Sequence, residues 1–273
     1  MTTPASVTFA SVSSASVKPA FVTPASVKPA SVTHDSAIIR KLTSFGALSC
    51  SDMTLLSDLH QRRRRYASGR EMVRQGQRNR TAYILADGWA FSYILLSDGA
   101  RQIVDVRIPG DFLGLGSMLF HKSDQNVEPI TAVEASEVQA SDLMTAFATT
   151  PNLARALLWA ASRDESLVAG RLTSLGRRQA PQRVAHFLLE LGVRLRLVGL
   201  ATKSGYNCPL TQYHLADLLG LSPVHINRVL RELREGGMVT FQNGRVTFDD
   251  LPGMVAFADF DRDYLDEKLP ALW

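Results

Sequence analysis

Basic side chains at helical spacing follow a glycine turn at residues 211–234, T-Q-Y-H-L-A-D-L-L-G-L-S-P-V-H-I-N-R-V-L-R-E-L-R. Gly220 permits a bend between two short helices, Ser222 can cap the second helix, and Pro223 would open it. The first helix would bury three leucines, Leu215, Leu218 and Leu219. The stretch predicts a helix-turn-helix, although an ordinary helical hairpin with a solvated basic face would also fit it.

The second predicted helix separates apolar from basic side chains. At about 100° per residue its apolar face is centred on Ile226, and the opposite face carries Arg228 and Arg231. In the major groove of DNA, Arg228 would reach base edges and Arg231 bases or phosphate, with His225 and Asn227 at the sides. The residues predicted to contact DNA are Thr211, Gln212, Ser222, Pro223, Val224, His225, Asn227, Arg228 and Arg231.

The composition narrows the class of protein. With 273 residues, of which 45% are hydrophobic, the chain can build a sizeable core, and its length favours two domains. Thirty Lys and Arg against 26 Asp and Glu give a net charge of +4, which is compatible with a polyanionic partner but too small to establish one. No apolar run is long enough to span a bilayer, and no basic segment precedes an apolar core at the N-terminus. We expect a soluble cytoplasmic protein with no membrane partner.

The two cysteines, Cys50 and Cys208, lie far apart and in no metal-ligand spacing. This excludes a disulfide framework, a zinc ribbon and a four-thiolate iron–sulfur site. Cys208 precedes the helix-turn-helix, so a thiol-redox switch is an alternative function; its thiolate would need a cationic neighbour such as Lys203. Because no nucleophile elbow, metal pair or phosphate loop followed by lysine is present, an enzyme would need residues scattered through the fold. We predict neither catalysis nor a cofactor.

The rest of the chain must position the residues predicted to contact DNA. Residues 1–36 form a degenerate repeat of Pro, Ala, Ser, Val and Thr, which predicts a disordered tail. An amphipathic stretch at residues 38–59 predicts one or two helices, and the arginine run at residues 62–65 is interpreted as a solvated edge. Short apolar runs between turn residues then predict an antiparallel barrel or sandwich, either a plain core or a container for one small ligand. Its clearest strands are residues 83–85, 89–96, 102–108 and 130–138.

Residues 151–177 repeat apolar side chains at alternating steps of four and three, which predicts a dimerisation helix with one acidic interruption. A single amphipathic helix packed on its own barrel is the alternative. A second helix at residues 181–197 leads to the helix-turn-helix, and residues 238–248 predict a hairpin wing around Asn243-Gly244. The predicted dimer seam consists of Ala154, Leu158, Ala161, Glu165, Val168, Leu172 and Leu175.

Two motifs occur in this order of elements, P-G-D-F-L-G at residues 109–114 and L-T-Q-Y-H-L-A-D-L-L-G-L-S-P-V-H-I-N-R at residues 210–228. Both resemble motifs of the cAMP receptor protein/FNR (Crp/Fnr) family of bacterial transcription regulators, and the resemblance covers about residues 40–250. It implies an α+β fold with an N-terminal antiparallel β-roll of the cyclic-nucleotide-binding kind, a long dimerisation helix and a C-terminal winged helix-turn-helix. The expected divisions are a disordered tail 1–36, sensor domain 37–148, dimerisation helix 149–178, DNA-binding domain 179–250 and C-terminal tail 251–273.

The resemblance also implies how the protein works. A homodimer would bind a two-fold symmetric site on double-stranded DNA, and an effector in the β-roll would reorient the DNA-binding domains. Residues 201–208 take the place where the family's activators touch RNA polymerase, so polymerase is a candidate partner. The effector pocket would involve Gly110, Asp111, Phe112, Leu113, Gly114 and Leu115.

The chain departs from the family's cAMP binders at the effector residues. Leu115 stands where they place the ribose-binding glutamate, and by gap placement Pro129 and Ile130 stand in for the phosphate-binding arginine and serine. Val168 and Ala169 replace the adenine-contacting pair. Loss of a charge-assisted phosphate contact alone costs about 1.5–3 kcal/mol, so we expect no cAMP effector. Haem would need an axial ligand, and His121, though conceivable, is a single loop histidine. The β-roll is thus an effectorless scaffold or a sensor of something unidentified.

Overall fold

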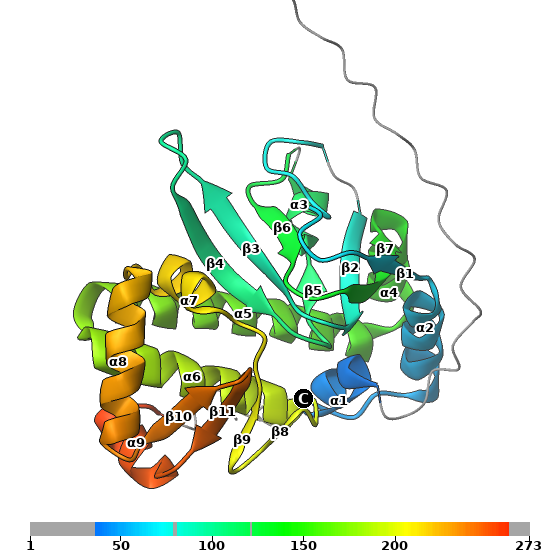
Figure 1. Ribbon diagram of the computed structural model, residues 1–273. Helices are drawn as coiled ribbons and strands as arrows, with labels where there is room; N and C mark the ends of the chain where they lie inside the picture. Colours follow the sequence, from blue (N-terminus) through cyan, green and yellow to red (C-terminus); the bar gives the residue numbers. More distant parts are fainter. Residues whose placement is uncertain (1–35, 79–80, 121, 262–273) are drawn as a thin grey trace, which may run out of the picture.

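The computed structural model describes residues 36–78, 81–120 and 122–261, and combines an N-terminal β-roll, a long helix and a C-terminal unit of helices around a small sheet (Figure 1). This architecture confirms the predicted α+β fold. The predicted tail at residues 1–36 lies, except for its last residue, outside the described part of the chain. None of the helices in the described part is long and apolar enough to cross a membrane.

The N-terminal amphipathic stretch forms two helices, α1 (Ala37–Thr43) and α2 (Cys50–Gln61). Ser49 begins α2 with a capping box, in which its hydroxyl accepts from the Asp52 amide and the Asp52 carboxylate accepts from the Ser49 amide. The buried apolar side chains of both helices share a core cluster with the first half of the long helix. These two helices therefore seal one end of the β-roll.

The β-roll consists of two antiparallel sheets. One has the strand order β1-β7-β2-β5 and the other β4-β3-β6. The strands are β1 (Arg63–Tyr66), β2 (Thr81–Asp87), β3 (Ala90–Leu95), β4 (Arg101–Arg107), β5 (Phe112–Leu113), β6 (Asn126–Pro129) and β7 (Val133–Gln139). A short helix, α3 (Leu115–Leu119), follows β5.

The arginine run lies on an edge strand, as its charge pattern predicted. Strand β1 pairs only with β7 among the described strands, and Arg64 and Arg65 remain largely exposed while pairing with Glu137 and Glu134. Such exposed ion pairs contribute little stability, and the charges discourage pairing with another sheet edge.

The predicted strand at residues 130–138 is wrong in its first part. The chain leaves one sheet after Pro129 and enters the other at Val133. At this crossing the amides of Ile130 and Thr131 both donate to the carbonyl of Trp89, so neither continues a ladder. Apolar residues on both sides of the crossing hid it from the sequence pattern.

Helix α5 (Pro151–Arg177) follows α4 (Ala140–Thr149) and runs along the β-roll, between it and α6 (Ala180–Leu197) (Figure 1). Its bounds match the prediction. One face of α5 is buried through Leu153, Leu157 and Leu167. The predicted seam lies beside this face, with Ala154 and Leu175 half-buried and the seam residues between them exposed.

The C-terminal unit contains α7 (Gln212–Leu219), α8 (Pro223–Glu235) and α9 (Leu251–Phe257) around a sheet of order β10-β11-β9-β8. Its strands are β8 (Ala201–Thr202), β9 (Gly205–Asn207), β10 (Val239–Gln242) and β11 (Arg245–Phe248). Met254 of α9 and Phe260 are buried in the same core as α6. Residues 251–260 therefore belong to this unit and are not a separate tail.

The β-roll and the C-terminal unit share one apolar core. Phe91 and Tyr93 of β3, and Trp89 just before it, join the cluster that contains α6, α7 and α8, whereas Ser92 turns to the interior of the roll. A single strand layer thus separates the inside of the β-roll from the C-terminal unit.

Candidate nucleic-acid interface and ligand cavity

Local capping fixes the geometry of the helix-turn-helix. The Thr211 hydroxyl accepts from the His214 amide at 3.3 Å at the start of α7, and the Ser222 hydroxyl accepts from the His225 amide at 3.2 Å at the start of α8. Between them Gly220 adopts φ 62°, a left-handed conformation that favours glycine. The predicted Ser222 cap and Gly220 turn are therefore present, and the Thr211 cap is an addition that was not predicted.

Helix α8 is apolar on one face and polar on the other. Ile226, Val229 and Leu233 are buried, whereas Val224 is 79% exposed. The exposed positions also include Asn227, Arg228 and Arg231, and neither arginine forms an ion pair with the residues that the structure describes. Pro223 and His225 are half-buried, and Ser222 is exposed at the helix start. A row of unneutralised guanidinium groups on an exposed helix suits contact with a nucleic acid.

A shallow concave surface of about 380 Å³ joins α7, α8 and the wing. Thr211 and Gln212, predicted to contact DNA, line it together with Asn227. Three polar residues on the same surface were not predicted, namely Tyr213, Gln242 and Asn243. The Asn243-Gly244 turn predicted a hairpin, but only the folded chain shows that its tip faces the same side as α8.

The other side of α7 packs on the β-roll. Arg101 of β4 forms an ion pair with Asp217 at 2.7 Å, and the Gln102 side chain donates to the carbonyl of Leu218 at 3.2 Å. The ring of His214 lies 5.5 Å from that of Phe91. These contacts hold the C-terminal unit against β3 and β4, while α8 remains at the outer edge of the molecule (Figure 1).

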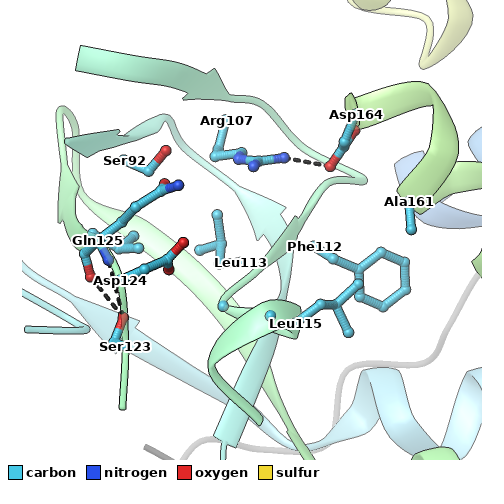
Figure 2. Close-up of a pocket in the computed structure, with 13 residues that line it drawn as sticks. Ser92, Arg107, Phe112, Leu113, Leu115, Ser123, Asp124, Gln125, Ala161 and Asp164 are labelled. Carbon is cyan, nitrogen blue, oxygen red and sulfur yellow. Dashed lines mark hydrogen bonds and ion pairs between the residues drawn. The ribbon is translucent and has the colours of Figure 1, made fainter. Parts of the chain in front are cut away.

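A cavity of about 210 Å³ lies inside the β-roll beside α5 (Figure 2). Of the predicted pocket residues, Phe112, Leu113, Gly114 and Leu115 line it, but Gly110 and Asp111 do not. The remaining lining residues are Ser92, Arg107, Gly116, Ser123, Asp124, Gln125, Val127, Ala161 and Asp164.

Four positions assigned by gap placement do not line this cavity. The wall opposite Leu115 is built by residues 123–125 and Val127, not by Pro129 and Ile130. On α5 the lining residues are Ala161 and Asp164, not Val168 and Ala169, which point to the exposed side of the helix. The loop before β6 carries no local pattern that fixes its register, so the sequence alone could not assign these contacts.

A cluster of buried charges surrounds Asp105 on β4. Its carboxylate pairs with Arg171 of α5 at 3.0 Å, Arg194 of α6 at 3.2 Å and Arg107 at 3.3 Å. Burial alone would raise the pKa of Asp105, but the charges of Arg194, Arg107 and Arg171 outweigh it and hold the pKa well below its usual range. Arg107 also pairs with Asp164 on the cavity wall. One carboxylate therefore connects the cavity, the long helix and the C-terminal unit.

Asp111 extends this cluster to α1. Its two carboxylate oxygens pair with Lys41 and Arg194, each at 2.8 Å. Burial opposes ionisation of Asp111, yet the charges of Lys41 and Arg194 lower its pKa to about 2. In this chain the aspartate of the P-G-D-F-L-G motif is thus a structural anion, which explains its absence from the cavity wall.

The predicted dimer seam forms a continuous strip on α5. Leu158 and Leu172 are 66% and 71% exposed, and Val168 is 41% exposed. Ala161 and Glu165 are also exposed, whereas Ala154 and Leu175 are half-buried. Large apolar side chains left in solvent along one helix face are typical of an interface that is completed by another surface.

The two cysteines differ in environment. Cys208 is 1% exposed, and burial raises the pKa of its thiol to about 12. Cys50 is exposed at the start of α2. No group of three or more His, Cys, Asp or Glu suited to a metal ion occurs in the described ranges, and His121 lies outside them.

Two protein-family models match this chain. Residues 63–150 match the cyclic nucleotide-binding domain, and residues 182–257 match the Crp-like helix-turn-helix domain. The first match spans the strands of the β-roll and the cavity wall apart from Ala161 and Asp164 on α5. The second spans the surface formed by α7, α8 and the wing, and includes α9.

Individual relatives agree with these matches. The chain is 30% identical over 198 residues to the nitrogen fixation regulation protein FixK of Bradyrhizobium diazoefficiens, which covers 72% of this chain and 82% of that protein. It is 24% identical over 217 residues to the transcriptional activator FnrA of Stutzerimonas stutzeri, covering 78% and 86%. These relatives are regulators and not enzymes, in agreement with the sequence analysis.

Solved structures share the fold. The structure of FixK2 from Bradyrhizobium japonicum superposes with a TM-score of 0.64 at 27% identity, covering 71% of this chain and 96% of that one. A CRP/FNR-family regulator from Thermus thermophilus gives a TM-score of 0.57 at 20% identity, covering 72% and 98%.

Proposed function

The chain belongs to the Crp/Fnr family of DNA-binding transcription regulators, and on this premise we propose that it acts as a homodimer on a palindromic promoter site. The observation that carries the proposal is the outer face of α8, where Arg228 and Arg231 are exposed and free of ion pairs with described residues. A duplex supplies both the phosphates and the guanine edges that such side chains bind.

The seam on α5 supports the dimer. Two chains that pair through Leu158, Val168 and Leu172 would remove these exposed side chains from water. Because Ala161 belongs to the seam and also lines the cavity, the dimer interface and the cavity would adjoin. A ligand in the cavity could then change how the two chains pair.

We infer that the cavity is the effector site and that cAMP is not the effector. Arg107, the single arginine among the described lining residues, is already bound by Asp105 and Asp164. A cyclic phosphate would have to displace a carboxylate to reach it, and Asp124 would repel the phosphate. We expect calorimetry with cAMP to give no saturable binding at micromolar concentrations and no change in DNA affinity.

Two finer parts of the proposal concern RNA polymerase and the thiol. Lys203 and Ser204 are exposed between β8 and β9, which supports a polymerase contact by residues 201–208.

A redox switch at Cys208 is the weaker alternative, because a buried thiol with a raised pKa forms little thiolate. Access to promoter DNA requires a cytoplasmic location.

Selection of bound DNA from a random pool tests the proposal. The expected product is a palindrome whose half-sites lie about one helical turn apart, each with one strictly required guanine. Binding should weaken steeply with salt and be equal with and without a thiol reductant. Enrichment of no motif, or of an asymmetric single site, would contradict the proposed dimeric regulator.

A further inference from the structure

Building on the proposed effector site, we propose that the cavity in the β-roll binds a small organic cation, with a protonated amine and an apolar body. Three charged side chains line it, Arg107, Asp124 and Asp164. Arg107 is paired with Asp164 and with Asp105 behind the wall. Asp124 forms no ion pair with any described residue, so the cavity carries an excess of negative charge.

The pairing of Arg107 decides the sign of the ligand. An anion would need to take the guanidinium from Asp164 and leave that carboxylate unpaired beside the ligand. A cation needs no such exchange, because the exposed Asp124 carboxylate points into the cavity and has no ion-pair partner among the described residues (Figure 2). The existing ion pairs therefore favour an amine over a carboxylate or phosphate.

A buried hydroxyl inside the cavity is the second observation. Ser92 lines the cavity and is 2% exposed, and its buried Oγ forms no hydrogen bond with the described residues. Buried polar groups in native proteins are nearly always hydrogen-bonded, so an unpartnered hydroxyl on a cavity wall indicates a polar group of an occupant. The side chain of Gln125 also lines the cavity and offers a further polar contact (Figure 2).

The remaining wall and the volume define the body of the ligand. Phe112, Leu113, Leu115, Val127 and Ala161 provide an apolar surface. Of these, Phe112, Leu115 and Ala161 lie on the side away from Asp124 (Figure 2). The cavity volume of about 210 Å³ lies below the usual range for sites that hold drug-sized molecules. It suits a ligand of on the order of ten non-hydrogen atoms.

The same residues connect the ligand to the C-terminal unit. Ser92 lies on the inner face of β3, whereas its neighbours Phe91 and Tyr93 pack on the core of that unit. Arg107 touches the cavity and shares Asp105 with Arg194 of α6. An amine held by Asp124 would lie in the same cavity as the Arg107–Asp164 pair, and any shift of Arg107 would reach α6 through the shared Asp105 carboxylate.

Three probes of nearly equal shape test the sign of the charge. Calorimetry on the full chain should show saturable binding of 2-phenylethylamine, weaker binding of 2-phenylethanol, and at least about tenfold weaker binding of phenylacetate than of the amine. Equal or tighter binding of phenylacetate, or the absence of saturable amine binding, would overturn the proposal.

Two variants test whether the probe binds in this cavity. Asp124→Asn should weaken 2-phenylethylamine about fivefold and leave 2-phenylethanol unchanged, because only the amine loses an ion pair. Ser92→Ala should weaken both probes by a similar factor, because each loses one hydrogen bond. Both variants should melt within a few degrees of the parent protein. Amine binding that neither variant weakens would lie elsewhere and would contradict the assignment.

DNA binding by the ligand-free protein separates this inference from the proposed function. A protein that binds its selected palindrome but no amine retains the regulator function and disproves the ligand class. A protein that binds the amine in the cavity but no specific DNA disproves the regulator proposal and leaves the cavity site standing.

Discussion

Two arginines on α8 would differ in their position relative to a DNA duplex bound at the outer face of this helix. Arg228 lies within the first turns of the helix, near Val224 and Asn227, where side chains of a recognition helix reach base edges. Arg231 lies almost a turn later, where a contact to phosphate is as accessible as one to bases. Val224 offers methyl groups suited to the thymine methyl, and Asn227 can pair with adenine. Their exposure makes all four testable by substitution.

We predict that Arg228→Ala weakens the selected site about tenfold or more and flattens the preference at the required guanine, because a bidentate contact to guanine discriminates by about 1–3 kcal/mol. Arg231→Ala should weaken all sequences evenly and reduce the salt slope by about 1. Titrations of the selected site and its guanine-substituted version at several salt concentrations measure both effects. An unchanged base preference in Arg228→Ala would make this residue a phosphate anchor only.

The Asp105 carboxylate is shared by Arg107, Arg171 and Arg194. We predict that Asp105→Ala lowers the free energy of unfolding by about 3–5 kcal/mol, because three guanidinium groups lose a shared acceptor inside the protein. Glu134→Ala removes the half-buried carboxylate that Arg63 and the exposed Arg65 share at the sheet edge, and should cost about 1 kcal/mol or less. Urea unfolding measures both. Equal losses of unfolding free energy in the two variants would show that burial does not make the Asp105 ion pairs more stabilising than those at the sheet edge.

The elements that the sequence predicted correctly are those with local signals. Ser222, Pro223 and Gly220 define the helix-turn-helix because caps and left-handed turns depend on a few adjacent residues. The heptad repeat likewise gave both ends of α5. Contacts between distant elements had no such signal. Arg194 and Asp105 are 89 positions apart in the chain, and their ion pair depends on the packing of α6 against β4. The position of residues 123–125 on the cavity wall depends on how β6 pairs with β3.

The predicted dimer seam on α5 can be tested by substituting its exposed leucines. Leu158→Glu combined with Leu172→Glu should yield monomers that no longer bind DNA specifically, because four carboxylates would face each other across the dimer seam. Sedimentation velocity measures the state of association. Leu200→Glu, at an exposed leucine outside the seam, should remain dimeric. A double variant that still sediments as a dimer would place the interface on another surface.

At the scale of the whole molecule, the shared core makes the two units interdependent. The core on the outer side of β3 contains α6, α7 and α8, and the cavity lies on its inner side. Arg101 and Asp217 add an ion pair at the rim of the same contact. A change of shape inside the β-roll therefore meets the C-terminal unit across one strand rather than through a flexible linker.

Two buried histidines give the whole fold a dependence on pH. Burial, aided by the charge of Arg63, lowers the pKa of His60 from 6.5 to about 4, and burial with the charges of Arg178 and Arg171 does the same for His186. Below pH 6.5 the unfolded chain binds protons at both rings that the folded protein does not bind until about pH 4. The free energy of unfolding must therefore fall as the pH falls through this window.

We predict that the contribution of the two histidines to the free energy of unfolding, measured with urea, is constant above about pH 7. It should fall steadily from pH 6.5 to about 4. A further loss should follow as Asp111, with a pKa of about 2 in place of 3.8, takes up its proton only in the unfolded chain. His186→Phe should reduce the slope between pH 6.5 and 4, because it removes one of the two rings and keeps an aromatic contact with Phe260. Stability that stays level or rises on acidification from pH 7 to 4.5 would show that both rings are protonated as readily in the folded protein as in the unfolded chain.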